Sequence, residues 1–424
     1  MRRTMIRAVV GIGILAVGAA GCSGESATER GGDGEAGTIS HWQHQSDARA
    51  EVVQNFVDDY DDAQIDFQSI PYESYFQKLG AALEAGNGPC VFQLPANILA
   101  EFQNRGQLAP VPDSLMSSAE IEEAFTPASI RLLQIEGSYY GLPTDVQTLM
   151  LFYNDDLFEE AGLDPTQDFD TWEDLRQAAV ELTKVDDGRM TQAGVDISAS
   201  PYQWFYSAPT LAYQDGLVND ASGDVNYDSE AGYQAWERLT GLVTEDGVDD
   251  PEFLAEQSKF ALGKAGMTFK EYTFTGVYEL TAPDLNFSVH PAPPVADETF
   301  APVASTSWAY AVSQDCEDQD AAWAWVAHLT SEDSQRVWVA EGGELPSRSA
   351  LLEDESLQND PNIAAGYASL LGAVPYDSNG WDDVFAIQQD IWDQILLNGQ
   401  DVQSAVDAGA EQERDLYRRK GLLD

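Results

Sequence analysis

A carboxylate stands at the junction of a turn and an apolar run in the stretch YGLPTDVQTLMLFYN, where Asp145 follows Gly-Leu-Pro-Thr. A carboxylate in such a place is suited to three kinds of chemistry. It can transfer protons as a general acid or base, it can accept hydrogen bonds from a ligand, or it can form the polar end of a turn. The rest of the chain decides between these three hypotheses for Asp145.

The sequence contains none of the common motifs of hydrolases or nucleotide-dependent enzymes. It has no Gly-x-Ser-x-Gly, no His-Glu-x-x-His and no phosphate-binding loop. With 73 Asp and Glu residues some carboxylate pair is always present, so their number is no evidence for a glycosidase. His41 and His44 are close in sequence, but no cysteine or third histidine is positioned to complete a zinc site. We therefore expect no catalytic residue, no metal and no cofactor.

The chain is strongly acidic, with a formal net charge of −52 from 73 acidic and 21 basic residues. This composition excludes nucleic-acid binding, because neutralising phosphates requires basic stripes. A strongly charged surface keeps a protein soluble, and salt screens its self-repulsion. We interpret the acidic excess as a halophilic adaptation to a saline exterior, and we expect a monomer.

The first 21 residues have the pattern of an export signal. Three arginines precede an uncharged run at 8–21, which is shorter than the ~20 apolar residues of a membrane-spanning helix. The run ends in AVGAAGC, which resembles a bacterial lipoprotein signal in which Cys22 is lipidated; the alternative is an ordinary signal peptide and a chance cysteine. Residues 22–37 are rich in Gly, Ser and Glu and predict a flexible tether. We expect a body anchored by lipid to the outer face of the cytoplasmic membrane.

The elements that would position Asp145 follow a strand–helix rhythm. Strands are predicted within GTISHWQHQS, QIDFQSIPY and PCVFQLP, and helices within DARAEVVQNFVDDYDDA, ESYFQKLGAALEAGNG and NILAEFQNRGQL. This order predicts a parallel sheet with helices on its faces. TLMLFYN predicts a strand buried on both faces, and LNFSVHPAPPV and TSWAYAVS predict two later strands. A chain of 424 residues is more than one hydrophobic core usually supports, so two domains are expected.

Four stretches resemble the extracellular solute-binding proteins of ABC importers, in the branch that includes maltose-binding protein and other carbohydrate receptors. They are YGLPTDVQTLMLFYNDDLFEEAGL with TWEDLRQAAVELT, then GNGPCVFQL, LGKAGMTF and AAWAWVAHLTSEDSQRVWVAEGGELPSRSAL, and the likeness extends over roughly residues 38–420. The chain departs from the family at three points. Cys90 replaces a usual Asp, FKEYTF replaces a usual Gly-x-Trp, and STSW replaces a usual Gly-Gly.

The resemblance implies an α/β, periplasmic-binding-protein-like fold. This fold has two α/β lobes, a ligand cleft between the lobes and hinge crossovers that join them. The crossings would lie near 143–147, near 303–307 and after 353–360. Lobe one would comprise residues 38–145 and 305–356, and lobe two would comprise residues 146–304 and 357–424.

Two cysteines, Cys90 and Cys316, remain besides Cys22. In an exported protein two cysteines can pair, but they can also be two unrelated buried thiols, and their spacing does not choose. In the fold that the resemblance implies, the strand that Cys90 begins and the strand that precedes Cys316 are antiparallel neighbours. The resemblance therefore implies a Cys90–Cys316 disulfide.

The resemblance also implies a function, which is non-covalent binding of a carbohydrate in the cleft and its delivery to the transmembrane subunits of an ABC permease. A carbohydrate presents flat apolar faces and a rim of hydroxyls, so its site needs aromatic plates and a few oriented polar side chains. Aromatic candidates are Trp42, Trp204, Tyr206, Tyr272, Trp308, Tyr376 and Trp381. Polar candidates are His44, Gln45, Gln93, Asn97, Asp145, Gln147, Lys270, Glu271, Glu344 and Arg348.

Each of these aromatic residues could instead be part of a core, and two other functions are kept as alternatives. One is a secreted carbohydrate-active hydrolase, and the other is a surface-binding lipoprotein without a transport role. An oligosaccharide is favoured as the ligand, because wide clefts with several aromatics suit longer sugars. Asp145 is then interpreted as a hydrogen-bond acceptor for a sugar hydroxyl at the base of the cleft, or as a hinge residue.

Overall fold

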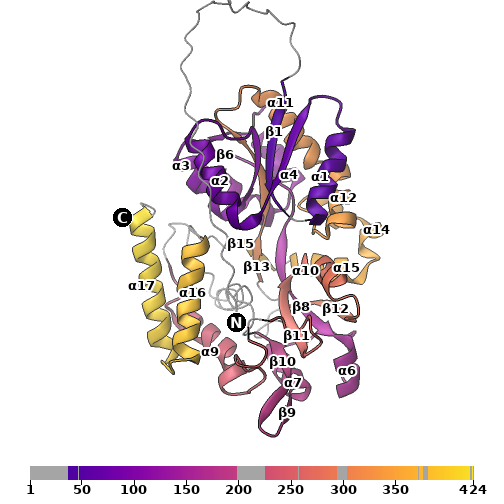
Figure 1. The fold of residues 1–424 in the computed structure, drawn as a ribbon, viewed down its shortest axis with the longest axis vertical. Helices are drawn as coiled ribbons and strands as arrows, with labels where there is room; N and C mark the ends of the chain where they lie inside the picture. The colour runs from indigo at the N-terminus through magenta and orange to yellow at the C-terminus, as the bar shows by residue number, and fades with distance from the viewer. Residues whose placement is uncertain are drawn as a thin grey trace, which may run out of the picture. The chain divides into compact units, whose positions relative to one another are not determined.

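The computed structural model describes residues 37–45, 47–197, 225–255, 257–293, 303–370, 372–375, 381–420 and 423 (Figure 1). The predicted signal peptide, Cys22 and all but the last residue of the predicted tether lie outside these residues. Among the described residues, no helix is both long enough and apolar enough to cross a membrane.

The first sheet is built mainly from the N-terminal third of the chain. Its strand order is β2-β1-β3-β14-β4, and β7 pairs with β14. β1 is parallel to β2 and β3, as the strand–helix rhythm predicts, whereas β14 is antiparallel to β3. The strands are β1 (Ile39–His44), β2 (Ile65–Ile70), β3 (Val91–Pro95), β4 (Leu108–Ala109), β7 (Leu142–Pro143) and β14 (Trp308–Ser313).

Helices cover this sheet and complete what we call the first lobe. In α2, Tyr75, Leu79 and Leu83 recur every four residues, so one stripe of the helix is buried against the sheet. The helix ends before Gly86, whose φ of 69° suits a residue without a side chain. The principal helices are α1 (Asp47–Asp59), α2 (Tyr72–Glu84), α3 (Leu99–Asn104), α11 (Gln319–Leu329) and α12 (Glu332–Gly342). The smaller elements are α4 (Ser118–Ala124), α5 (Pro127–Ile130), β5 (Gln134–Ile135) and β6 (Ser138–Tyr139).

The second sheet has the order β15-β13-β8-β11-β10-β9, and β12 pairs with β8. β8 is buried along its whole length, as its continuous apolar run predicts. Leu149, Leu151 and Tyr153 face one core, while Met150 and Phe152 face a second core on the opposite side of the strand. The strands are β8 (Gln147–Asn154), β9 (Lys184–Asp186), β10 (Arg189–Asp196), β11 (Ala265–Glu271), β12 (Phe287–Pro291), β13 (Val303–Thr306) and β15 (Ala373–Pro375).

The helices around the second sheet complete the second lobe. α16 and α17 lie side by side and pack with α9 (Figure 1). Their apolar faces join the core that contains one side of β8. These helices are α6 (Asp155–Ala161), α7 (Trp172–Leu182), α9 (Glu230–Thr244), α10 (Phe274–Thr281), α15 (Pro361–Leu370), α16 (Trp381–Leu396) and α17 (Val402–Lys420).

The chain passes between the lobes at three places. The first passage connects β7 to β8, and the second connects β13 to β14. The third follows α13 (Ser349–Leu352) and α14 (Glu355–Gln358), since α13 packs on α12 whereas α15 packs on β12. The two-lobe α/β fold class is therefore confirmed, while the residue limits given for the lobes stay a prediction.

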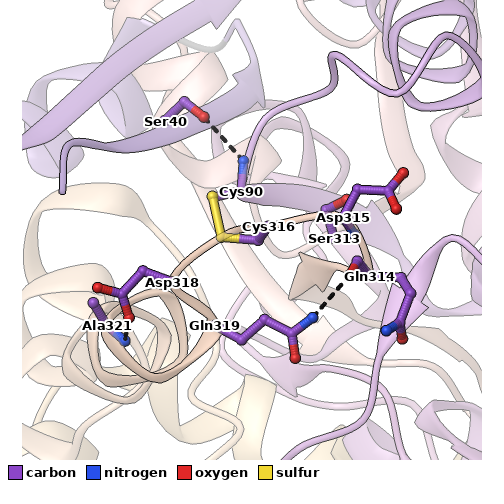
Figure 2. The surroundings of a disulfide bond; sticks show 9 residues. All are labelled: Ser40, Cys90, Ser313, Gln314, Asp315, Cys316, Asp318, Gln319 and Ala321. Atoms are coloured by element: carbon purple, nitrogen blue, oxygen red, sulfur yellow. Dashed lines mark hydrogen bonds between the residues drawn. A yellow bond between two sulfur atoms is a disulfide. The ribbon is translucent and has the colours of Figure 1, made fainter. Parts of the chain in front are cut away.

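A disulfide joins Cys90 to Cys316 in the first lobe (Figure 2). The two cysteines are 226 residues apart in sequence, and their Cα atoms are 4.8 Å apart. The pairing follows from the antiparallel β3–β14 register, because the Ser313 amide donates a hydrogen bond to the Cys90 carbonyl at 2.8 Å. The disulfide implied by the family resemblance is thus present, and the alternative of two separate thiols is excluded.

Candidate functional site

A cavity of about 580 Å³ lies between elements of the first and second lobes. The first lobe contributes the end of β1 with α2 and α3, and the second contributes β8, β11 and α10. The passages between the lobes supply what we call the cleft floor, which consists of Asp145, Gln147, Thr306 and Trp308. This volume is within the ~300–1,000 Å³ range of small-molecule sites.

The wall on the first-lobe side is aromatic. Tyr72, Phe76 and Gly80 line the cavity at a spacing of four residues along α2. The rings of Phe76 and Trp308 are nearly parallel, with an interplanar angle of 22° and centroids 6.3 Å apart. The His44 ring lies 4.4 Å from the Trp308 ring. Flat apolar faces of this kind pack against the apolar faces of a ligand.

The opposite wall comes from β11 and α10. Phe269 stacks on Trp172 behind it at 6.1 Å, which fixes the orientation of the ring that lines the cavity. Phe274 and Val277 line the cavity from α10. The Lys270 ammonium lies 4.8 Å from the centroid of the Phe274 ring, and burial lowers the pKa of Lys270 to about 8. Aromatic rings from both lobes therefore line the cavity.

Asp145 in the cleft floor is fully buried and accepts four hydrogen bonds. Oδ1 accepts from the Thr144 hydroxyl at 2.9 Å and from the Trp308 amide at 3.1 Å. Oδ2 accepts from the Gln147 amide group at 2.9 Å and from Arg49 Nη2 at 3.1 Å. The carboxylate thus ties the first passage to the second passage and to α1, a hinge arrangement that uses its accepting capacity within the protein.

Arg49 also pairs with Glu344, which lies beside the first passage. The Val146 amide donates to the Leu345 carbonyl at 3.1 Å, so the segment after α12 runs along the same floor. Burial raises the pKa of Glu344 well above its usual range, even with the Arg49 guanidinium beside it. Burial and the Arg49 charge lower the pKa of His44 to about 4, which leaves a neutral imidazole at the cavity edge at neutral pH.

This arrangement is suited to holding a ligand rather than to transferring protons. A general acid or base must reach the reacting atom within hydrogen-bond distance, and Asp145 is enclosed by its four donors. In the described parts of the chain, no group of three or more His, Cys, Asp or Glu residues is placed to hold a metal ion.

Comparison with known proteins identifies the family. The profile of the bacterial extracellular solute-binding proteins matches residues 51–365. The chain belongs to this family. The resemblance noted in the sequence is thereby confirmed, and the family is one of exported binding proteins.

Curated relatives of this solute-binding protein include two oligosaccharide receptors. The arabinooligosaccharide-binding protein of Bacillus subtilis is 29% identical over 192 residues, which are 44% of this chain and 43% of that protein. The maltotriose-binding protein of Pyrococcus abyssi is 22% identical over 374 residues, which are 85% of this chain and 78% of that protein. The first match spans less than half of the relative's length, whereas the second spans most of it.

Solved structures of the family share the fold. The substrate-binding protein of an ABC transporter from Listeria monocytogenes, in complex with cycloalternan, superposes with a TM-score of 0.75 at 20% identity. The superposition covers 91% of this chain and 100% of that protein. The two-lobe architecture of the solute-binding family therefore extends over nearly the whole body of this chain.

Six of the residues predicted from sequence line the cavity. They are His44, Asp145, Gln147, Lys270, Glu271 and Trp308. They come from the end of β1, the cleft floor, β11 and the start of β14, so the fold brings together segments distant in sequence. Their contact with a ligand stays a prediction.

Seven other predicted residues do not line this cavity. The Trp42 ring packs on the first-lobe core beneath the Lys78 ammonium, and Gln45 is exposed. Tyr272, which directly follows β11, belongs to a core of the second lobe. Arg348 lies 4.1 Å above the Phe125 ring and donates to the Thr330 carbonyl. The remaining three are buried beside the floor or the sheet: Gln93, Asn97 and Glu344.

Three predicted aromatics, Trp204, Tyr206 and Tyr376, lie outside the described residues. Trp381 begins α16, but its side chain is also outside the described part of the structure. These four candidates stay predictions.

Sequence reasoning missed Arg49, Tyr72, Phe76, Phe269 and Phe274. For α2 no separate signal was present in the sequence, because its apolar residues form the single broad face of an ordinary amphipathic helix. Residues 75, 79 and 83 of that face are buried in the core, and residues 72, 76 and 80 along its edge line the cavity.

Proposed function

We propose that the protein is the substrate receptor of an ABC importer and binds an oligosaccharide in the cavity between its lobes. The bound sugar is released to the transmembrane subunits of a permease. The body is held at the outer face of the cytoplasmic membrane by a lipid on Cys22 and works as a monomer, without catalytic residues.

The observation that carries this proposal is the pair of facing aromatic walls. Phe76 and Trp308 come from the first lobe, and Phe269 and Phe274 come from the second. A pyranose ring between such walls buries both of its apolar C–H faces, and its hydroxyls reach polar groups such as Gln147 and Glu271. Because the walls belong to different lobes, both contact the sugar only when the cleft is closed, so binding stabilises the closed state.

The relatives support the same ligand class. Two of them are named for arabinooligosaccharide and maltotriose, and the Listeria structure contains cycloalternan. A cavity of about 580 Å³ is large enough for more than one sugar ring. Hydrolysis is less well supported, because Asp145 is committed to four protein donors.

The test is a thermal-shift screen of the protein across mono- and oligosaccharides, including arabino-, malto- and galacto-oligosaccharides. A sugar present at 100 times its Kd stabilises the folded state by about 2.7 kcal/mol, which is a shift of several degrees. Chromatography of each sugar after incubation then shows whether it was cleaved. Saturable binding without cleavage supports the receptor, cleavage supports the hydrolase, and neither supports the surface-binding lipoprotein.

A further inference from the structure

An ion pair connects the two lobes across the mouth of the cavity. Lys420 at the end of α17 lies with its Nζ 3.6 Å from Oε1 of Glu101 on α3. Both residues line the cavity. α3 packs in the first-lobe core through Leu99 and Phe102, whereas α17 packs in a second-lobe core through Leu416 and Tyr417. In Figure 1 the C-terminal end of α17 points toward α3.

Each member of this pair has a second partner within its own lobe. Glu101 is 3.6 Å from Arg105, one helical turn further along α3. Lys420 is 3.3 Å from Asp383 on α16. Separation of the lobes therefore breaks one ion pair but leaves neither charge without a counter-charge.

Basic residues are scarce in this chain, and two of them lie at the contact between the lobes. Only 21 of 424 residues are Lys or Arg, against 73 acidic residues, yet Arg105 and Lys420 both lie at the mouth of one cavity. Two lobes of a strongly acidic protein repel each other, and a cation at their contact offsets that repulsion locally. The side chain of Lys420 is 27% exposed and that of Glu101 is 23% exposed, so water reaches the pair and salt can screen it.

We propose that Glu101 and Lys420 form a clasp, an ion pair that holds the cleft closed. When the cleft opens, this pair breaks, and Glu101 stays paired with Arg105 while Lys420 stays paired with Asp383. This inference rests on the proposed function only in assuming that the lobes move about the hinge. The clasp is weak and reversible, since exposed ion pairs favour the paired state only about two- to fivefold. By holding the lobes together, the clasp keeps the two aromatic walls near each other. Glu101 and Lys420 line the cavity themselves but are not members of the aromatic walls.

The experiment measures the distance between the lobes without any ligand. Spin labels are attached at Glu84 on α2 and Glu237 on α9, two exposed helical positions in different lobes. Distance distributions are recorded at low salt for the wild type, Lys420→Met, Glu101→Gln and the double variant. Arg418→Met is the matched control, because Arg418 is on the same helix and pairs with Glu411 and Asp415 within it.

We expect each single variant to lower the ratio of closed to open molecules about two- to fivefold. The double variant should match the single variants, because the second substitution removes a partner already lost. Arg418→Met should resemble the wild type. At about 1 M salt the difference between the wild type and Lys420→Met should disappear, because salt screens both the ion pair and the repulsion between the lobes.

Equal distributions in the wild type and Lys420→Met would overturn the clasp, and so would additive effects in the double variant. Failure of the proposed function looks different. In that case no sugar binds, whereas the distance change on Lys420→Met is still observed. If sugars bind but the interlobe distances are the same in the wild type and Lys420→Met, the proposed receptor function is supported and the proposed clasp is wrong.

Discussion

Arg49 in α1 donates a hydrogen bond to Asp145 in the first passage between the lobes, with Nη2 and Oδ2 3.1 Å apart. The two residues are 96 positions apart, and both are buried. The same arginine pairs with Glu344, and the same aspartate accepts from the Trp308 amide at the second passage. A network centred on Arg49 and Asp145 therefore joins the start of α1 to both passages and to the segment after α12.

This relationship predicts that Asp145→Ala destabilises the protein. The substitution removes four hydrogen bonds and leaves the Arg49 guanidinium buried with one partner fewer. We expect a loss of about 2–4 kcal/mol in the free energy of unfolding, measured by guanidinium denaturation. Asp113→Ala, at an exposed position, is the control and should change stability by less than about 0.5 kcal/mol. Unchanged stability with lost sugar binding would instead make Asp145 a ligand contact.

The aromatic walls predict that loss of a single ring weakens sugar binding. Phe76→Ala and Phe274→Ala should each weaken sugar binding about tenfold, because each removes a ring that lines the cavity. Isothermal titration with a sugar identified in the screen measures the change. Leu280→Ala is the control, since Leu280 is on the same helix as Phe274 but is 75% exposed. Equal affinities for all three variants would show that the sugar lies elsewhere.

The disulfide predicts a large effect on stability and none on the site itself. Replacing Cys90 and Cys316 together by Ser should lower the free energy of unfolding by about 2–5 kcal/mol, because the cross-link closes a long loop. Denaturation with and without reductant checks this. Reductant should destabilise the wild type and leave the double variant unchanged. A wild type that is indifferent to reductant would contradict the prediction.

Burial of His41 predicts how stability responds to acid. The ring is fully buried and accepts from Trp325 Nε1 at 3.2 Å, and burial lowers its pKa from 6.5 to about 3. Between these values the unfolded chain binds a proton and the folded chain does not, so stability falls as pH falls from 6.5 toward 3. The slope from this one group is at most about 1.4 kcal/mol per pH unit.

The measurement compares the wild type with His41→Leu, which keeps the other titrating groups. Denaturation at several pH values from 4 to 7 should give a shallower pH dependence for the variant. Parallel curves for the two proteins would mean that His41 does not contribute.

Much of the fold follows from local sequence patterns. β8 was predictable because its apolar run is continuous, and the strand is buried on both faces. β15 was missed, since only three residues, Ala373–Pro375, form it and its pairing with β13 is a tertiary contact. The Cys90–Cys316 pairing depended on family resemblance, because sequence separation gives no information about the β3–β14 register.

The site was harder to predict than the fold. Arg49 was missed because a helix pattern does not show which distant carboxylate its guanidinium reaches. Trp42 was expected in the cavity because polar residues flank it, but the side of the sheet that it faces depends on packing with the helices. Lys270 and Glu271 were named although FKEYTF departs from the family pattern, and the direction of β11 brings both to the cavity.

The position of β14 determines the order in which the first lobe can be completed. An exported chain emerges N-terminus first, so β1, β2 and β3 reach the exterior long before Trp308–Ser313. β14 lies between β3 and β4, so these two strands have no common neighbour until the second-lobe strands from β8 to β13 have emerged. During that interval the unpaired edge of β3 is open to pairing with strands of other chains. The first lobe therefore begins to emerge before the second lobe, but its sheet can be completed only after β13 has been exported.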